Sequence, residues 1–226
     1  MGEQQAEEKP RRRGRPRKAS SVSGLGTEED ILVSAAKQFS EVGFGSTSTY
    51  AIAQGAGISQ ATMYHHFGGK HAILLALLLR TVEPSVAYAD GLAGAEGTAA
   101  ARLWALCAYD ARLLASGETN LGSLYLLPEL GDERFASFHA QRDRLAGVYA
   151  GLVAALVAEQ GVAEGAGELA DLVFGLVESV ILRRRDAGVA PGREVTDRIA
   201  DAALRVVGLD ADAVAAAREA GAALVP

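Results

Sequence analysis

Apolar residues recur at helical spacing along most of this chain, beginning near residue 28. Ile31, Ala35, Phe39 and Val42 stand three or four positions apart and form one stripe. Gly43 follows directly, where a helix commonly ends. The pattern predicts a first helix over Glu28–Val42, with Thr27 and Asp30 at a spacing like that of a capping box.

A pair of short helices joined by a tight turn is predicted next, over residues 47–70. In the first, Thr49–Gly55, Ile52 and Ala53 face inward, and small Ala53 lets another helix cross closely. Thr47 or Ser48 is its expected N-cap. Gly57 occupies the turn, where a left-handed backbone suits glycine.

The second short helix is expected to begin after Ser59, whose hydroxyl can accept a first-turn N–H. Met63 and Phe67, four apart, predict its buried face. The opposite face then carries small or polar side chains: Gln60, Ala61, Thr62, Tyr64 and His65. A helix with such a face can enter the major groove of DNA and reach base edges.

The rest of the chain repeats the helical pattern without the alternation typical of strands. A short apolar segment at 124–127 is stopped by Pro128, and Pro84 could kink the helix that contains it. The fold class predicted is all-α. The further helices are expected at about 69–90, 98–116, 132–160, 168–185, 194–207 and 211–224.

Composition agrees with a helical, cytoplasmic protein. Its 226 residues suffice for one large or two modest domains, and 49% are apolar. Cys107 is the single cysteine, so no disulfide can form within the chain. The N-terminus resembles no secretory signal, and the longest apolar run, Ala72–Leu79, is too short to span a bilayer.

Charge is distributed unevenly. Residues 1–70 hold nine Lys/Arg and seven Asp/Glu, a net charge of +2; the remaining 13 and 21 give −8. A basic N-terminal region followed by an acidic remainder is typical of a nucleic-acid-binding protein whose second domain has a different function. Residues 1–26 are poor in apolar side chains and are predicted to be a disordered basic arm.

Within that arm, Lys9–Lys18 carries seven positive charges and no negative one. Arg13, Gly14, Arg15 and Pro16 resemble the core of an AT-hook, in which arginines enter a narrow A·T-rich minor groove. A basic tail that contacts phosphates without sequence preference is the alternative interpretation.

Residues 31–70 carry a resemblance to a known family. From Ile31 to Lys70 the chain reads IL-x2-AA-x2-F-x3-GF-x2-TS-x3-IA-x2-AG-IS-x3-Y-x-HF-x2-K, which resembles the DNA-binding domain of the TetR family of bacterial transcriptional regulators. About 40 of 226 residues carry the pattern. Gly68–Gly69 departs from it, since a polar residue often stands just before the lysine.

The resemblance implies a three-helix DNA-binding head over 27–70 and a ligand-binding, dimerising body over 71–226. By this resemblance the recognition helix contacts bases through its first residues, while other side chains contact phosphates. The implied DNA-binding residues, with the two arginines of the arm, are Arg13, Arg15, Thr47, Ser59, Gln60, Ala61, Thr62, Tyr64, His65, His66 and Lys70.

The resemblance also places a two-fold interface on the last two long helices, at 168–185 and 194–207. The first carries a wide apolar stripe, of which part is expected to pack inward and part to meet a second copy. Its members are Leu169, Leu172, Val173, Leu176, Val177, Val180 and Ile181.

A small-molecule effector of unknown identity is expected in the body. Large aromatic side chains stand out in this alanine- and leucine-rich region, and they could line a pocket or simply fill the core. The candidates are Trp104, Tyr109, Tyr125, Tyr149 and Phe174, followed by Tyr88 and Phe138.

The sequence shows no set of residues with the spacing of a catalytic or metal site. Cys107 lies in an apolar helix, and His65, His66, His71 and His139 show no convergent metal-ligand spacing. We therefore expect no catalytic residues, metal or cofactor, and predict a ligand-responsive repressor that binds a palindromic operator as a homodimer. The alternatives are a DNA-architectural protein that uses the basic arm, and an enzyme or carrier with a vestigial head.

Overall fold

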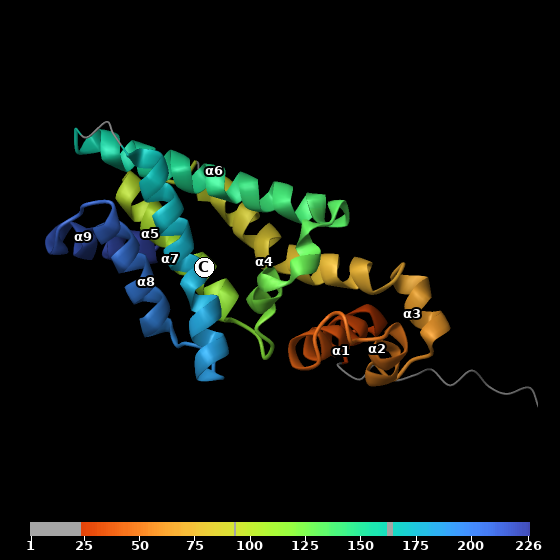
Figure 1. Cartoon of the computed structure of the whole chain (residues 1–226). Coiled ribbons are helices and arrows are strands. Elements are labelled where there is room, and N and C mark those ends of the chain that lie inside the picture. Colours follow the sequence, from red (N-terminus) through yellow and green to blue (C-terminus); the bar gives the residue numbers. More distant parts are fainter. Residues whose placement is uncertain (1–23, 93, 162–164) are drawn as a thin grey trace, which may run out of the picture.

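The computed structural model describes residues 24–92, 94–161 and 165–226, and Figure 1 shows their arrangement. Residues 1–23, which include most of the predicted arm with Arg13 and Arg15, lie outside the described residues. The described part is helical and contains no strand, as predicted. Its helices are α1 (Thr27–Glu41), α2 (Thr49–Gly55), α3 (Gln60–His66), α4 (Lys70–Leu92), α5 (Ala99–Ala115), α6 (Ala136–Glu159), α7 (Ala166–Ala187), α8 (Arg193–Val206) and α9 (Ala211–Ala222).

The head consists of α1, α2 and α3, which lie at one end of the molecule (Figure 1). Ile31, Ile52 and Met63, one from each helix, are fully buried in the common core. The predicted caps of α2 and α3 are confirmed: Ser48 accepts the N–H of Ala51, and Ser59 that of Thr62, both at 3.1 Å.

Two local details of the head differ from the sequence prediction. Gly26, not Thr27, is the N-cap of α1, and no side chain caps that helix. Phe67 is partly buried just after α3, at its C-cap, whereas Met63 alone is buried within α3. The Gly57 turn is as predicted, with φ of 70°.

The body is built around α5, which contacts α4, α6, α7, α8 and α9. An alanine- and leucine-rich helix that is apolar on nearly all sides is stable only when surrounded. Leu106 and Cys107 are accordingly inaccessible to solvent, so the interpretation of Cys107 as a small core residue is confirmed.

The long helix predicted over 132–160 begins later, so this prediction is wrong at its start. Three short 3₁₀ turns precede α6: η1 (Leu121–Leu126), η2 (Pro128–Gly131) and η3 (Glu133–Phe135). The Asp132 carboxylate accepts the N–H of Arg134 at 2.9 Å, which stabilises a turn instead of a helix. Phe135 is fully buried, and α6 begins at Ala136.

The connection between head and body is α4, which packs on α1 and also on α5 and α6. It contains Pro84 and begins at Lys70, where the predicted domain boundary lies. By length and composition α4 could span a membrane, yet half of its most apolar window is buried inside this fold. The helix therefore serves as a core element, and the division into domains at residue 70 stays a prediction.

Candidate DNA-binding face and effector cavity

The candidate recognition face is the exposed side of α3. Met63 is fully buried and anchors the helix, whereas the remaining residues of α3 point outward. All six predicted DNA-contacting residues of this helix are exposed: Gln60, Ala61, Thr62, Tyr64, His65 and His66. The structure thus brings them together on one surface, with the exposed cap Ser59 beside them.

Side chains on this face are linked to α2 by hydrogen bonds. The Gln60 side-chain amide donates to Oγ1 of Thr49 at 2.8 Å, and the Tyr64 hydroxyl lies 3.3 Å from the same oxygen. The Ser59 and Thr62 hydroxyls are 2.8 Å apart. Sequence reasoning missed Thr49, although its place beside the Ser48 cap put it on the same edge of the head.

Lys70 and Thr47 occupy positions inside the packing of the head. The Lys70 ammonium donates to the carbonyls of Phe44, Gly45 and Thr47 at 2.9, 3.2 and 3.3 Å, and lies 4.6 Å from the centre of the Phe44 ring. The Thr47 hydroxyl donates to the Gly43 carbonyl at 2.8 Å, and the residue is 4% exposed. Their phosphate contacts stay predictions, because both polar groups already have protein partners.

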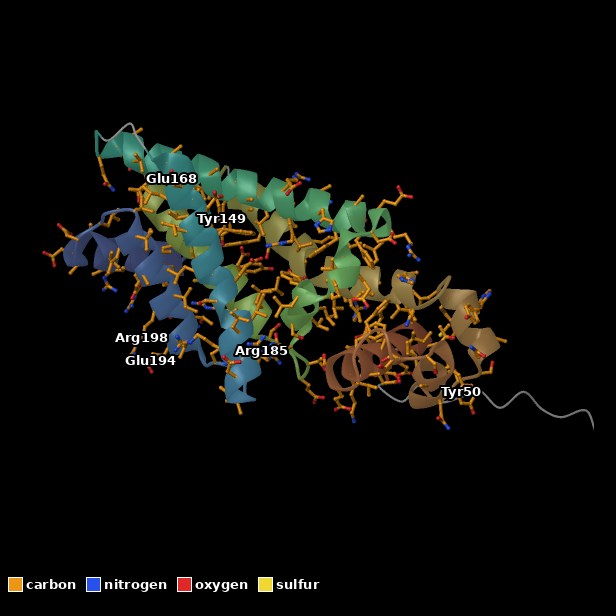
Figure 2. All side chains as sticks on the ribbon, in the orientation of Figure 1. Tyr50, Tyr149, Glu168, Arg185, Glu194 and Arg198 are labelled. Carbon is orange, nitrogen blue, oxygen red and sulfur yellow. The ribbon has the colours of Figure 1, made fainter. Side chains whose placement is uncertain are left out.

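Tyr50 is a second residue that sequence reasoning missed. It is a large, exposed aromatic side chain on α2 (Figure 2). A residue two positions before the inward-facing Ile52 lies on the opposite side of the helix, which is the signal that could have found it. Its phenol could contact a phosphate without reading sequence.

A small cavity lies in the body, lined by residues of α4, α5, η1, α6 and α7. It leaves ≈ 10 Å³ for the centre of a water-sized sphere, which is room for about one water molecule. Tyr125 and Phe174 line it, as do three charged residues that the sequence analysis did not single out: Asp110, Arg142 and Glu178.

The charged groups of this cavity form two separate pairs. Asp110 accepts a hydrogen bond from the Tyr149 hydroxyl at 2.7 Å, and burial raises the pKa of Asp110 to about 6. Arg142 pairs with Glu178, and its guanidinium carbon lies 5.0 and 5.5 Å from the ring centres of Tyr125 and Phe174. Burial likewise raises the pKa of Glu178.

The other predicted pocket residues are engaged differently. Trp104 donates its indole N–H to Asp201 of α8 at 2.8 Å, and Tyr109 stacks on Tyr88 with ring centres 4.1 Å apart. Tyr149 reaches the cavity indirectly, through Asp110. The sequence signal for a polar cavity was Asp110 itself, the single acidic residue of α5.

The apolar stripe of α7 divides as expected into an inward and an outward part. Val173, Val177 and Val180 are buried, whereas Leu172 is 60% exposed and Leu182, beyond the predicted stripe, 43% exposed. Figure 2 shows Glu168 and Arg185 toward the two ends of α7, with Glu194 and Arg198 on neighbouring α8.

Among the described residues, no group of three or more His, Cys, Asp or Glu side chains lies close enough together to hold a metal ion.

The short helices α2 and α3 are joined by a tight turn, α3 is exposed, and α4 connects them to a helical body. This arrangement defines a helix-turn-helix DNA-binding protein.

Comparisons with known proteins agree with this class. The profile of the bacterial regulatory proteins of the tetR family matches residues 31–77. The crystal structure of Mycobacterium smegmatis AmtR is 45% identical, with a TM-score of 0.79 over 96% of this chain and 100% of that one. PfmR from Thermus thermophilus, a TetR family transcriptional regulator, is 27% identical, with a TM-score of 0.67 over 80% of this chain and 98% of that one.

The regulator UidR of Escherichia coli strain K12 is 43% identical over 61 residues, which are 27% of this chain and 31% of UidR. The chain therefore matches about a third of the length of this curated relative. Taken with the nearly full-length likeness to AmtR, these findings show that the chain belongs to the TetR family of bacterial transcriptional regulators, which are generally DNA-binding repressors. The named relatives are regulators, not enzymes.

Proposed function

We propose that this protein is a cytoplasmic, effector-responsive repressor that binds a palindromic operator as a homodimer. The observation that carries the proposal is the face of α3, where six polar or small residues are exposed around a single buried anchor, Met63. Gln60 can bind adenine through both groups of its amide, and Thr62 can contact neighbouring bases.

The exposed leucines of α7 support the two-fold assembly. Leu172 and Leu182 lie on the side of α7 that faces away from the core, although leucine is costly to leave in water. A second copy that covers this face with its own α7 and α8 would bury them. Two heads of such a dimer meet successive major grooves when they are about 34–36 Å apart.

Release by an effector follows from a population shift. A ligand that binds better to a conformer with wrongly spaced heads lowers operator affinity by its difference in affinity for the two conformers. The cavity beside α4 supports a site in the body, because α4 packs on the head as well.

The test combines selection of binding sites from random DNA with footprinting and sedimentation of the full-length protein. A short protected palindrome bound by a dimer is the expected result. Diffuse protection of A·T-rich DNA would instead support the architectural alternative, and a monomer at micromolar concentration would contradict the two-head mechanism.

A further inference from the structure

A second hollow lies between the head and the body. This head–body crevice has a volume of ≈ 300 Å³, and its walls come from α1 on one side and α4, α5 and η1 on the other. Its apolar lining includes the side chains of Leu32, Val33, Leu77, Leu113 and Leu121. Pockets from about 300 Å³ upward accommodate small organic ligands.

The head–body crevice and the buried cavity share a wall. Thr81 and Leu114 line both hollows. The Thr81 hydroxyl donates to the Leu78 carbonyl at 2.6 Å and lies 2.5 Å from the Tyr125 hydroxyl, so this part of the wall is fixed. Leu114 has no side-chain hydrogen bond, so a ligand that joins the two hollows would have to displace this side chain.

The buried end of this pair of hollows has an unpaired acceptor. Oδ2 of Asp110 accepts from Tyr149, and the Ser85 hydroxyl also lies close enough to interact with the carboxylate, but the buried Oδ1 has no hydrogen-bond partner within the described part of the chain. Asp110 is 3% exposed, so solvent does not replace the missing donor. A buried acceptor without a partner loses its hydration and gains nothing in return.

Charge in both hollows favours a cation. Each contains two carboxylates and one arginine, and in each the arginine is paired with one of the carboxylates, Arg142 with Glu178 and Arg80 with Glu29. Asp110 is left without a cationic partner among the described residues. A positive ligand nitrogen would supply both the missing charge and the missing donor.

We propose that the head–body crevice and the cavity form one effector site, which binds a small amphiphilic amine with its hydrocarbon part in the crevice and its ammonium group at Asp110. The inference rests on the proposed function, because it names the chemical class of the effector. A carboxylate ligand would be repelled by Asp110, which has no cationic partner, and a wholly apolar ligand would leave Oδ1 unpaired.

The position of this site between head and body explains how ligand binding could change the orientation of the head. One wall is α1, and the other includes the loop after α5, which is fastened to α7. Arg184 of α7 donates to the Ser116 carbonyl at 2.6 Å, and the Asn120 amide donates to the Ile181 carbonyl at 2.9 Å. A ligand between these walls contacts the head on one side and an anchored loop on the other, so it favours particular head orientations.

The experiment measures the melting temperature and binding isotherms of the full-length protein with matched probes: hexylamine, butylamine, hexan-1-ol, hexanoate and ammonium chloride. Hexylamine should stabilise the protein most, because binding to the folded state raises the melting temperature. Butylamine should bind more weakly, since it buries less hydrocarbon. Hexan-1-ol, hexanoate and ammonium chloride should have little effect.

Two variants with matched controls locate the site. Asp110→Asn should weaken hexylamine binding by about 10- to 100-fold, as expected for a lost charged hydrogen bond. Asp143→Asn, on the exposed face of α6, is its control. Val33→Ser should remove most of the gain in affinity from butylamine to hexylamine. Val42→Ser should keep that gain, because Val42 is exposed at the C-cap of the same helix.

Equal stabilisation by hexan-1-ol, or unchanged hexylamine affinity in both Asp110→Asn and Val33→Ser, would overturn the proposal. If no probe binds to a protein that still protects a palindrome, the amine class is rejected and the regulator stands. A protein that protects no palindrome would instead reject the proposed function.

Discussion

Gln60 and Thr49 are joined by a hydrogen bond of 2.8 Å across the two short helices of the head. Tyr64 approaches the same Thr49 hydroxyl, at 3.3 Å. The side chain predicted to read bases is thus held by α2 in the protein alone. Such pre-organisation reduces the conformational entropy lost when the helix enters the groove.

Substitution of Gln60 tests the placement of the recognition helix. Gln60→Ala should cost about 1–3 kcal/mol on the true operator and relax the preference at one base pair, because a bidentate contact is lost. Thr49→Val should weaken binding less while keeping the same preferred base. Selection from random DNA with each variant measures both effects; an unchanged consensus for Gln60→Ala would show that α3 is oriented differently.

Leu172 and Leu182 offer a direct test of the homodimer. Both are exposed on α7, so Asp at either position should leave the protomer folded while placing a charge in the interface. We expect monomers by sedimentation, with the helical circular dichroism retained. Val180 is fully buried, and Asp there would unfold the protein instead.

A control for that experiment is Leu126→Asp, since Leu126 is similarly exposed but lies on η1, outside the two helices of the proposed interface. This variant should remain dimeric. Monomers from all three variants would indicate a general loss of structure, and dimers from all three would place the interface elsewhere.

Asp110 should make stability depend on pH. Burial raises its pKa to about 6, from an ordinary value of 3.8, while the Ser85 and Tyr149 hydroxyls oppose the rise. A raised pKa contributes stability that is fully present below about pH 4 and is lost as the pH rises through about 6. Asp110→Asn removes that loss, so it should raise the free energy of unfolding at pH 7.5 by up to about 3 kcal/mol.

Urea unfolding of wild type and Asp110→Asn between pH 5 and 8 measures this effect. The gain should shrink steadily toward acid, because the wild-type carboxyl then becomes neutral too. Asp143→Asn, an exposed change on α6, should show no such trend. A gain that is constant over the range would mean that Asp110 does not titrate there.

The elements of the head could be predicted from sequence because their signals are local. Ser48 and Ser59 cap their helices through neighbouring N–H groups, and Gly57 takes a positive φ within a single turn. None of these features depends on what packs from elsewhere in the chain. The all-α class followed in the same way, from periodicity.

Prediction was less successful where contacts between residues far apart in the sequence determine the structure. Periodicity extended the helix of α6 back to Asp132, but a side-chain hydrogen bond to Arg134 and the burial of Phe135 produce a 3₁₀ turn there. Trp104 stood out as an aromatic residue for a pocket, yet its partner Asp201 lies 97 positions further along the chain. Arg142 and Glu178 meet only because α6 and α7 pack together.

The basic arm, Lys9–Lys18, should contribute its own phosphate contacts. Its seven cationic side chains, with no acidic residue within the run, should release counterions on binding, and log K should fall with log salt at about −0.9 per contact. If about four of the seven engage, deletion of residues 1–18 should make the slope shallower by about 3–4 units. Operator binding across a salt series measures it.

Minor-groove insertion by Arg13 and Arg15 would add a dependence on the flanking sequence. Deletion of residues 1–18 should then lower the affinity more for operators flanked by A·T tracts than for operators flanked by G·C, because narrow grooves attract arginine. An unchanged salt slope would reduce the arm to a solubility tail. A changed slope without flank dependence would keep the phosphate contacts and discard the insertion.

Lys70 has two candidate roles that one substitution can separate. Its ammonium donates to three carbonyls of the segment between α1 and α2, and the family resemblance assigns it a phosphate contact. Lys70→Met keeps the side-chain stem against the Phe44 ring and removes the charge and the donors. We expect the melting temperature to fall, since hydrogen bonds to a charged group contribute about 1.5–3 kcal/mol.

DNA binding by Lys70→Met should weaken for all sequences alike, because no base contact is lost. The salt dependence tells the roles apart. A slope shallower by about 0.9 shows that a phosphate contact disappeared. If binding weakens at an unchanged salt slope and the melting temperature falls, Lys70 acts through its hydrogen bonds to the segment before α2, by a bracing role that holds this segment in place. An unchanged melting temperature would contradict the bracing role, because the three carbonyls would then lose their donor without any effect on the folded head.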